Sequence, residues 1–297
     1  MDPFSGEGEL LTITTHFHTH AYTKVLEYDT SPLSPPNRSI ARILQHRSRI
    51  ALGQSRQVLS QLSSAKDAAS QAIQALAHQS LGNDKGVELA RELAETDGED
   101  SVVQVVCGTV LAAAGEYEKA VELLGKHQGN LEAVALLTQI YLLQNRTDLA
   151  LKEVQAAKRW AQDSLLINLA EAWLGLRVGG DKYQSSYYIY EELASTPSTT
   201  TASSLVAQAV ADMHLNRLPE ADATLQQALE LDPHDAHARA NQVVLACLMG
   251  RKRPDVEGLV AGLSDVDDGH PLVRGLGEME ARFDEAAGRY QARVAAG

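Results

Sequence analysis

The stretch SSLVAQAVADMHLNRLPEADATLQQALELDP, residues 203–233, decides the fold of this chain. In its first half, Leu205, Ala209 and Met213 recur every four residues, which places them along one face of a helix. After a break of four or five residues, Pro219 opens a second helix, where its missing N–H costs nothing in the first turn. The stretch therefore predicts two helices packed back to back as a hairpin.

The same pattern recurs along the chain with small residues in corresponding places. Ala120, Ala150, Ser186 and Ala221 are separated by 30, 36 and 35 residues, close to the period of about 34 residues of a tetratricopeptide repeat. One hairpin cannot bury its apolar faces alone, so neighbouring copies are expected to stack on one another. The predicted repeats span residues 101–125, 131–157, 165–193, 203–233 and 238–263.

The predicted fold is all-α: a curved, tetratricopeptide-like α-solenoid of helical hairpins, with further helical hairpins before the repeats and a capping helix after them. The expected N-terminal helical segments are 15–28, 39–62, 65–80 and 85–94, with a proline-marked loop at 31–36. The expected organisation is a flexible tail over 1–14, the solenoid over 15–263, and a linker with a capping helix (272–294) over 264–297. Ser31 and Ser34 precede prolines, which fits solvated turn residues better than phosphorylation sites.

Composition excludes several classes of function. The chain is 44% apolar but only 5% aromatic, which suits close helix packing better than sheets. Its formal charge of -13 argues against nucleic-acid binding and against direct docking on anionic membranes. The N-terminus carries no secretory pattern, and no apolar stretch approaches the roughly 20 residues of a membrane span. A cytosolic chain with Cys107 and Cys247 as reduced thiols is expected.

The sequence holds no convincing catalytic or metal-binding motif. His16 and His20 stand four apart, but no third ligand accompanies them. Residues 179–182, GGDK, lack the glycine spacing and the Ser or Thr of a phosphate loop, and residues 265–269 lack the closing Glu of a calcium loop. The sequence therefore predicts no enzyme activity, no cofactor and no metal.

The first helix of each hairpin is expected to line a concave inner wall. Residues one position away from the helix face that packs within the hairpin should line this wall. Most of them are apolar. This favours a bound polypeptide, because large exposed apolar patches are rare on monomers. The alternative is a tightly curved solenoid in which these side chains pack on each other. The predicted wall residues are Val102, Val105, Thr109, Ala112, Ala135, Gln139, Leu142, Ile167, Glu171, Leu174, Val206, Val210, Met213, Ala240, Val244 and Cys247.

A resemblance to a known family is carried by the third repeat, LAEAWLGLRVGGDKYQSSYYIYEELA, residues 169–194. A Leu-Ala-x-Ala-Trp helix runs into a Gly-Gly-acidic-Lys turn and then a Tyr-Tyr-Ile-aromatic-x-Glu helix. This stretch resembles the epsilon subunit of coatomer. The matching residues are Leu169, Ala170, Ala172, Trp173, Gly179, Gly180, Asp181, Lys182, Tyr187, Tyr188, Ile189, Tyr190 and Glu192.

This resemblance implies a tetratricopeptide subunit of the COPI vesicle coat that grips the C-terminal region of the alpha subunit of coatomer (alpha-COP) as a stable heterodimer. It also implies a place on the cytosolic face of Golgi membranes and COPI-coated vesicles, with membrane association only through the coat. Golgi-to-ER retrograde and intra-Golgi transport would be the process served. The alternative function is a co-chaperone or adaptor that captures a peptide terminus, which requires Lys, Arg and Asn on the inner helix faces.

Overall fold

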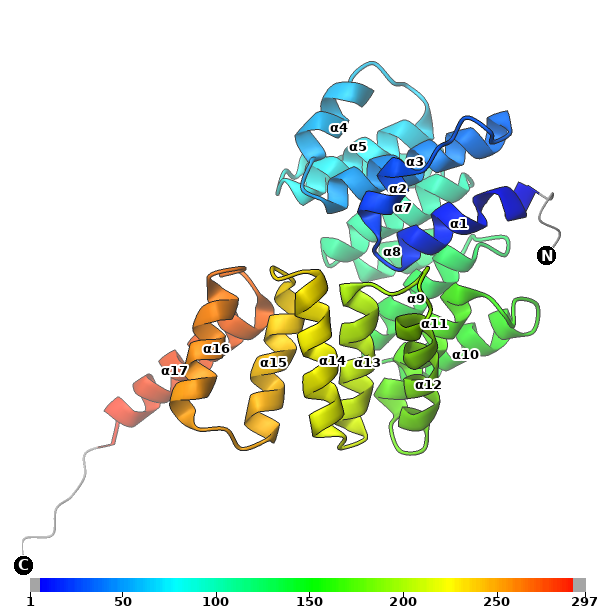
Figure 1. The fold of residues 1–297 in the computed structure, drawn as a ribbon. Helices are drawn as coiled ribbons and strands as arrows, with labels where there is room; N and C mark the ends of the chain where they lie inside the picture. The colour runs from blue at the N-terminus through cyan, green and yellow to red at the C-terminus, as the bar shows by residue number, and fades with distance from the viewer. Residues whose placement is uncertain (1–5, 291–297) are drawn as a thin grey trace, which may run out of the picture. The chain divides into compact units, whose positions relative to one another are not determined.

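The computed structural model describes residues 6–290, and within that range the chain forms seventeen helices and no strand (Figure 1). It divides between Thr200 and Thr201 into two compact units. The first unit contains α1 (Gly6–His18), α2 (Tyr22–Glu27), α3 (Pro35–Ala51), α4 (Ser55–Leu62), α5 (Ala68–Ser80), α6 (Lys85–Thr96), α7 (Ser101–Ala113), α8 (Tyr117–Leu124), α9 (Leu131–Leu143), α10 (Thr147–Lys158), α11 (Leu165–Val178) and α12 (Lys182–Ser195). The second contains α13 (Ala202–His214), α14 (Leu218–Leu231), α15 (Ala236–Leu248), α16 (Arg253–Ser264) and α17 (Pro271–Gly288). The predicted all-α class is confirmed.

The predicted repeats are hairpins of neighbouring helices. They are α7–α8, α9–α10 and α11–α12 in the first unit, and α13–α14 and α15–α16 in the second. Within each unit the first helices also pack on one another, α7 on α9, α9 on α11, and α13 on α15. Each hairpin stacks only on its neighbours in the chain, and the first helices therefore form a row.

A residue with left-handed backbone geometry reverses the chain in most of these hairpins. After Asn145 (φ 58°), the Arg146 N–H donates to the Tyr141 carbonyl at 2.7 Å, which closes the end of α9. Glycine adopts this geometry without strain and asparagine tolerates it, so both are common at helix C-termini. The equivalent residues of the other hairpins are Gly53, Gly82, Gly115, Asn216 and Gly250.

Small residues let the paired helices approach closely, as the sequence predicted. Ala120, Ala150 and Ala221 are fully buried, and Ser186 is 1% exposed. Gly86 of α6 faces the backbone of α5, where an added Cβ would lie 2.5 Å from the Ala75 carbonyl oxygen. At these contacts the helix backbones lie so close together that one added methyl group would force the two helices of a hairpin apart.

Residues 6–14 depart from the flexible tail expected over 1–14, of which residues 1–5 lie outside the described residues. Helix α1 begins at Gly6, and His20 (φ 63°) separates it from α2, so the single helix expected over 15–28 is wrong. The Glu9 carboxylate of α1 accepts hydrogen bonds from the Ser34 N–H (3.1 Å), the Ser34 hydroxyl (2.9 Å) and the Asn37 amide (2.7 Å). These bonds attach α1 to the start of α3, which explains why these residues are ordered as a helix.

Helix α3 also begins earlier than predicted, at Pro35 rather than after the proline-rich loop. Pro35 and Pro36 occupy the first helical turn, where a missing N–H leaves no intrahelical bond unmade. At the other end of the chain α17 ends at Gly288, and residues 291–294 of the expected capping helix lie outside the described residues. None of the described helices is long and apolar enough to span a bilayer.

Candidate partner-binding surface

In the first unit the predicted wall residues divide into buried and accessible side chains. Val105, Ala135, Ile167 and Leu174 are at most 5% exposed, so they contribute little open surface to the expected wall. Neighbouring helices cover them: Ile167, for example, packs in a cluster with Val134 and Ala157. Accessible positions are Val102, Thr109, Ala112, Gln139, Leu142 and Glu171, of which Gln139 is exposed and the others are half-buried.

The second unit shows the same division on α13 and α15. Val206 and Ala240 are buried, at 8% and 6% exposure, and belong to the interior rather than to a wall. Val210 and Met213 of α13 are half-buried. Val244 and Cys247 of α15 are exposed, together with the neighbouring Leu248 and Met249. The accessible part of the predicted wall in this unit is therefore apolar.

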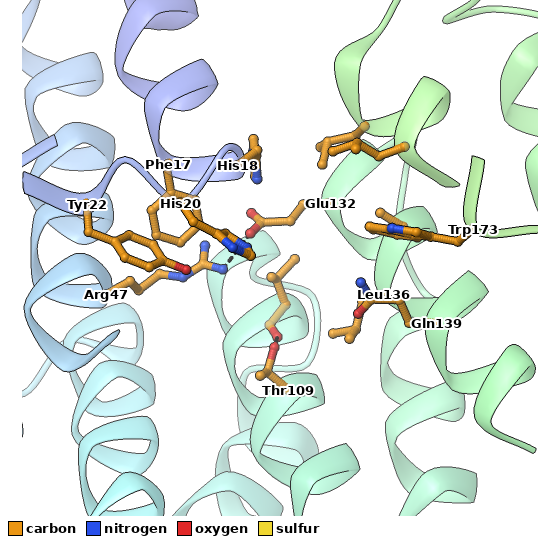
Figure 2. A pocket seen from close by; sticks show the side chains of 14 residues that line it. Phe17, His18, His20, Tyr22, Arg47, Thr109, Glu132, Leu136, Gln139 and Trp173 are labelled. Carbon is orange, nitrogen blue, oxygen red and sulfur yellow. Dashed lines mark hydrogen bonds and ion pairs between the residues drawn. The ribbon is translucent and has the colours of Figure 1, made fainter. Parts of the chain in front are cut away.

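A cavity of about 310 Å³ lies on the inner side of α7, α9 and α11 in the first unit (Figure 2). Four predicted wall residues line it: Val105, Thr109, Ala135 and Gln139. Its opposite wall comes from the N-terminal segment, which contributes the side chains of Phe17, His18, His20 and Tyr22, and from Arg47 of α3. The aromatic residues of this segment were visible in the sequence, but no local signal placed them against helices about 100 residues away.

An ion pair joins the two sides of this cavity. The Arg47 guanidinium donates to Oε1 of Glu132 at the start of α9, and it also lies 4.5 Å from the centre of the Phe17 ring. Burial by itself would raise the pKa of Glu132, but the charge and hydrogen bond of Arg47 outweigh it and hold that pKa below its usual value. Glu132 is therefore an ionised, paired carboxylate at neutral pH.

We expect three histidines on the N-terminal helices to lower the free energy of unfolding in mild acid. Burial is the largest cause that lowers the pKa values of His16, His18 and His46 in the folded chain. The unfolded chain, with histidine pKa values near 6.5, therefore binds more protons once the pH falls below about 6.5. The free energy of unfolding should be constant above about pH 6.5 and should fall as the pH drops below it. The slope should stay below the limit of about 1.4 kcal/mol per pH unit for each histidine, because His16 and His46 are only half-buried and solvent screens their contribution.

Denaturant titrations of the chain at pH 7.5, 6.5, 6.0 and 5.5 measure this slope. The His46→Phe variant removes one of the three groups, so its slope should be shallower than that of the unaltered chain. A free energy of unfolding that stays constant or rises between pH 6.5 and 5.5 would contradict the burial of these histidines.

A second groove, of about 940 Å³, continues from the cavity along α1. It shares His18, Glu132 and Leu166 with the cavity and is flanked by Leu11 and Trp160, which are 52% and 54% exposed. The sequence did not predict this groove, because it forms between α1 and the segments that precede α9 and α11.

The remaining candidate groups are dispersed. The described residues contain no group of three or more His, Cys, Asp or Glu that could hold a metal ion. His20 stacks on Tyr22, with ring centres 5.5 Å apart. Cys107 is buried and Cys247 exposed, and both are free thiols. Burial raises the pKa of the Cys107 thiol to about 12, so it is not a reactive thiolate.

Comparison with solved structures identifies the fold. A tetratricopeptide repeat protein from Parabacteroides merdae matches with a TM-score of 0.60 and 11% sequence identity, covering 79% of this chain and 95% of that protein. A chain in the crystal structure of the APC/C hetero-tetramer Cut9-Hcn1 matches with a TM-score of 0.58 and 13% identity, covering 87% of this chain and 51% of that one. These likenesses confirm the tetratricopeptide-like architecture.

Sequence comparison identifies the family. The probable coatomer subunit epsilon of Schizosaccharomyces pombe is 32% identical over 248 residues, which cover 83% of each chain. Coatomer subunit epsilon-1 of Arabidopsis thaliana is 28% identical over 298 residues, covering 96% of this chain and 98% of the relative. The family model of the coatomer epsilon subunit matches residues 6–291. The chain therefore belongs to the coatomer epsilon subunit family and is a subunit of the COPI vesicle coat.

Proposed function

We propose that this coat subunit is a non-catalytic scaffold that holds the C-terminal region of alpha-COP on its inner helices and stabilises it. Through this contact it would support Golgi-to-ER retrograde and intra-Golgi transport, on the cytosolic face of Golgi membranes and COPI-coated vesicles. Its own association with the membrane would then be peripheral and made only through the coat. The chemistry of the inner helices supports a role in binding protein.

The observation that carries this proposal is the exposed apolar face of α15. Val244, Cys247 and Leu248 follow one another at helical spacing, and Val244 and Leu248 are 40% and 55% exposed. Val210 and Met213 add half-buried apolar surface from α13, which packs directly on α15. An exposed apolar patch built by two adjacent first helices is the kind of surface that a stable partner covers.

A charge placed on this face should disrupt the complex without unfolding the chain. Val244→Glu is expected to weaken binding of the alpha-COP C-terminal region by roughly 30-fold, because its carboxylate would be buried without a partner at the contact. Helical content should stay unchanged, since the side chain is 40% exposed in the free chain. Co-expression followed by gel filtration and by titration calorimetry measures both properties.

The matched control is Leu231→Glu, which adds the same charge to the 58% exposed end of α14, the second helix of its hairpin. Leu231→Glu should leave the affinity unchanged. If Val244→Glu and Leu231→Glu bind equally well, the partner contacts another surface. If the unaltered chain and the alpha-COP region do not co-elute, the proposed partner is wrong.

The same assay at rising ionic strength separates this proposal from an adaptor that captures a peptide terminus. Capture of a carboxylate requires a cationic side chain that is available on the inner helices. Arg47, which lines the cavity, is already paired with Glu132. An apolar contact should persist from 0.1 to 1 M salt, whereas capture of a carboxylate should weaken strongly.

A further inference from the structure

We infer that the cavity of the first unit is an anchor site for one large aromatic side chain of the partner, a tyrosine or a tryptophan with a hydrogen-bond donor at its tip. This inference rests on the proposed function, because it assigns a specific residue type to the partner polypeptide of that proposal. Three properties of the cavity support it: its volume, the aromatic residues that line it, and the Arg47–Glu132 ion pair at its polar end.

The cavity has room for one large side chain. Its volume of about 310 Å³ lies at the lower end of the range for ligand pockets, roughly 300–1,000 Å³. Interfaces commonly place one anchor residue in such a pocket, and Trp and Tyr are the most frequent anchors after Arg is set aside on grounds of charge.

The walls favour an aromatic ring. Phe17 and Tyr22 lie on one side, edge to face with ring centres 5.8 Å apart, and Trp173 and Leu136 lie on the other side (Figure 2). Because His20 stacks on Tyr22 and the Arg47 guanidinium lies over the Phe17 ring, an inserted flat ring would meet these two planar groups on one side and Trp173 on the other. Such aromatic pairs contribute about 0.5–1.5 kcal/mol beyond the burial of area.

The polar end of the cavity selects a neutral donor. Oε1 of Glu132 accepts a hydrogen bond from Arg47, while Oε2 accepts none from any residue in the described part of the chain. The charges of Arg47 and Glu132 cancel. A cationic side chain would be attracted by Glu132 but repelled by Arg47, and a carboxylate would be attracted by Arg47 but repelled by Glu132. A tyrosine hydroxyl or an indole N–H can donate to Oε2 without bringing a net charge.

Small analogues of side chains test the site in the free chain. The chain has two tryptophans, Trp160 and Trp173, so Trp160→Phe leaves the indole of Trp173 as a single reporter in the NMR spectrum. 4-Methylphenol should shift its N–H resonance saturably, at lower concentration than toluene, n-butylammonium or acetate. A tighter response to n-butylammonium than to 4-methylphenol, or no response to 4-methylphenol, would overturn the inference.

A filled cavity should abolish that response. Gln139→Phe places a ring in the cavity from an exposed position of α9, so the fold should be retained. Gln155→Phe, at an exposed position of the outer helix α10, is the matched control and should preserve the shift. An unchanged response to 4-methylphenol in Gln139→Phe would overturn the assignment of the site.

The complex with the alpha-COP region provides the second readout. Gln139→Phe should weaken this complex by roughly 30-fold, the loss typical of a removed anchor contact, and Gln155→Phe should leave it unchanged. If the unaltered chain binds 4-methylphenol but not the alpha-COP region, the anchor site stands and the proposed function fails. If Gln139→Phe binds the alpha-COP region as tightly as the unaltered chain, the anchor role is wrong and the proposed function stands.

Discussion

Replacing Ile167 with alanine is expected to lower the free energy of unfolding of the first unit by about 3 kcal/mol, because its side chain is 0% exposed and packs with Val134 and Ala157. Truncation of a buried isoleucine removes its transfer free energy and leaves a cavity, at a combined cost of about 2–5 kcal/mol. For a unit of about 200 residues this corresponds to a drop in melting temperature of roughly 6–12 °C. Calorimetry and denaturant titration measure both quantities.

Leu143→Ala is the matched control for Ile167→Ala, because Leu143 of the neighbouring helix α9 is 71% exposed. Truncation there should change the free energy of unfolding by no more than about 0.5 kcal/mol. If Ile167→Ala costs as little as Leu143→Ala, then Ile167 lies on an open wall, as its place in the sequence pattern predicted. The comparison therefore tests the division of the inner helices into interior and accessible residues.

Gly86→Ala is expected to destabilise the first unit by about 2–3 kcal/mol. The added Cβ would lie 2.5 Å from the Ala75 carbonyl oxygen and 2.6 Å from the Gln79 nitrogen, both backbone atoms of α5. Backbone atoms within a helix cannot rotate away, so α5 and α6 must separate, and overpacking of this kind costs about 1–3 kcal/mol. Circular dichroism during thermal unfolding measures the loss.

The control is Gly258→Ala in α16, where an added Cβ meets nothing within 4 Å. Alanine inside a helix is favoured over glycine by roughly 0.5–1 kcal/mol, so this variant should be neutral or more stable. Equal melting temperatures for Gly86→Ala and the unaltered chain would contradict the close approach of α6 to the backbone of α5.

Much of the fold could be predicted because its signals are local. The small residues Ala120 and Ala150 and the turn residues Gly115 and Asn145 each act within one hairpin, between residues that are close in the chain. Repetition of these signals at a nearly constant period then predicted the row of hairpins. The residues 169–194 carried the family resemblance, and comparison with relatives confirmed it.

The inner wall was predicted less well, for a physical reason. Helical periodicity identifies which residues share a face, but it does not tell which of two adjacent faces a neighbouring helix covers. Val105 and Ile167, the fifth residue of α7 and the third of α11, are covered, whereas Val244, the ninth residue of α15, is 40% exposed, although all three were predicted to lie on the wall. The ninth residue of the first helix is accessible at Thr109, Gln139, Val210 and Val244, whereas the fifth is buried at Val105, Ala135, Val206 and Ala240, where a neighbouring helix covers it.

The sequence by itself determined the all-helical class, the hairpins and their turns, and the family, since these depend on residues within a few helical turns of one another. Only the tertiary structure decided that α1 and α2 form a wall of the cavity, and that Arg47 meets Glu132 across 85 residues of sequence. Contacts of that range have no periodic signal, because they arise only when the stacked hairpins bring the two elements together.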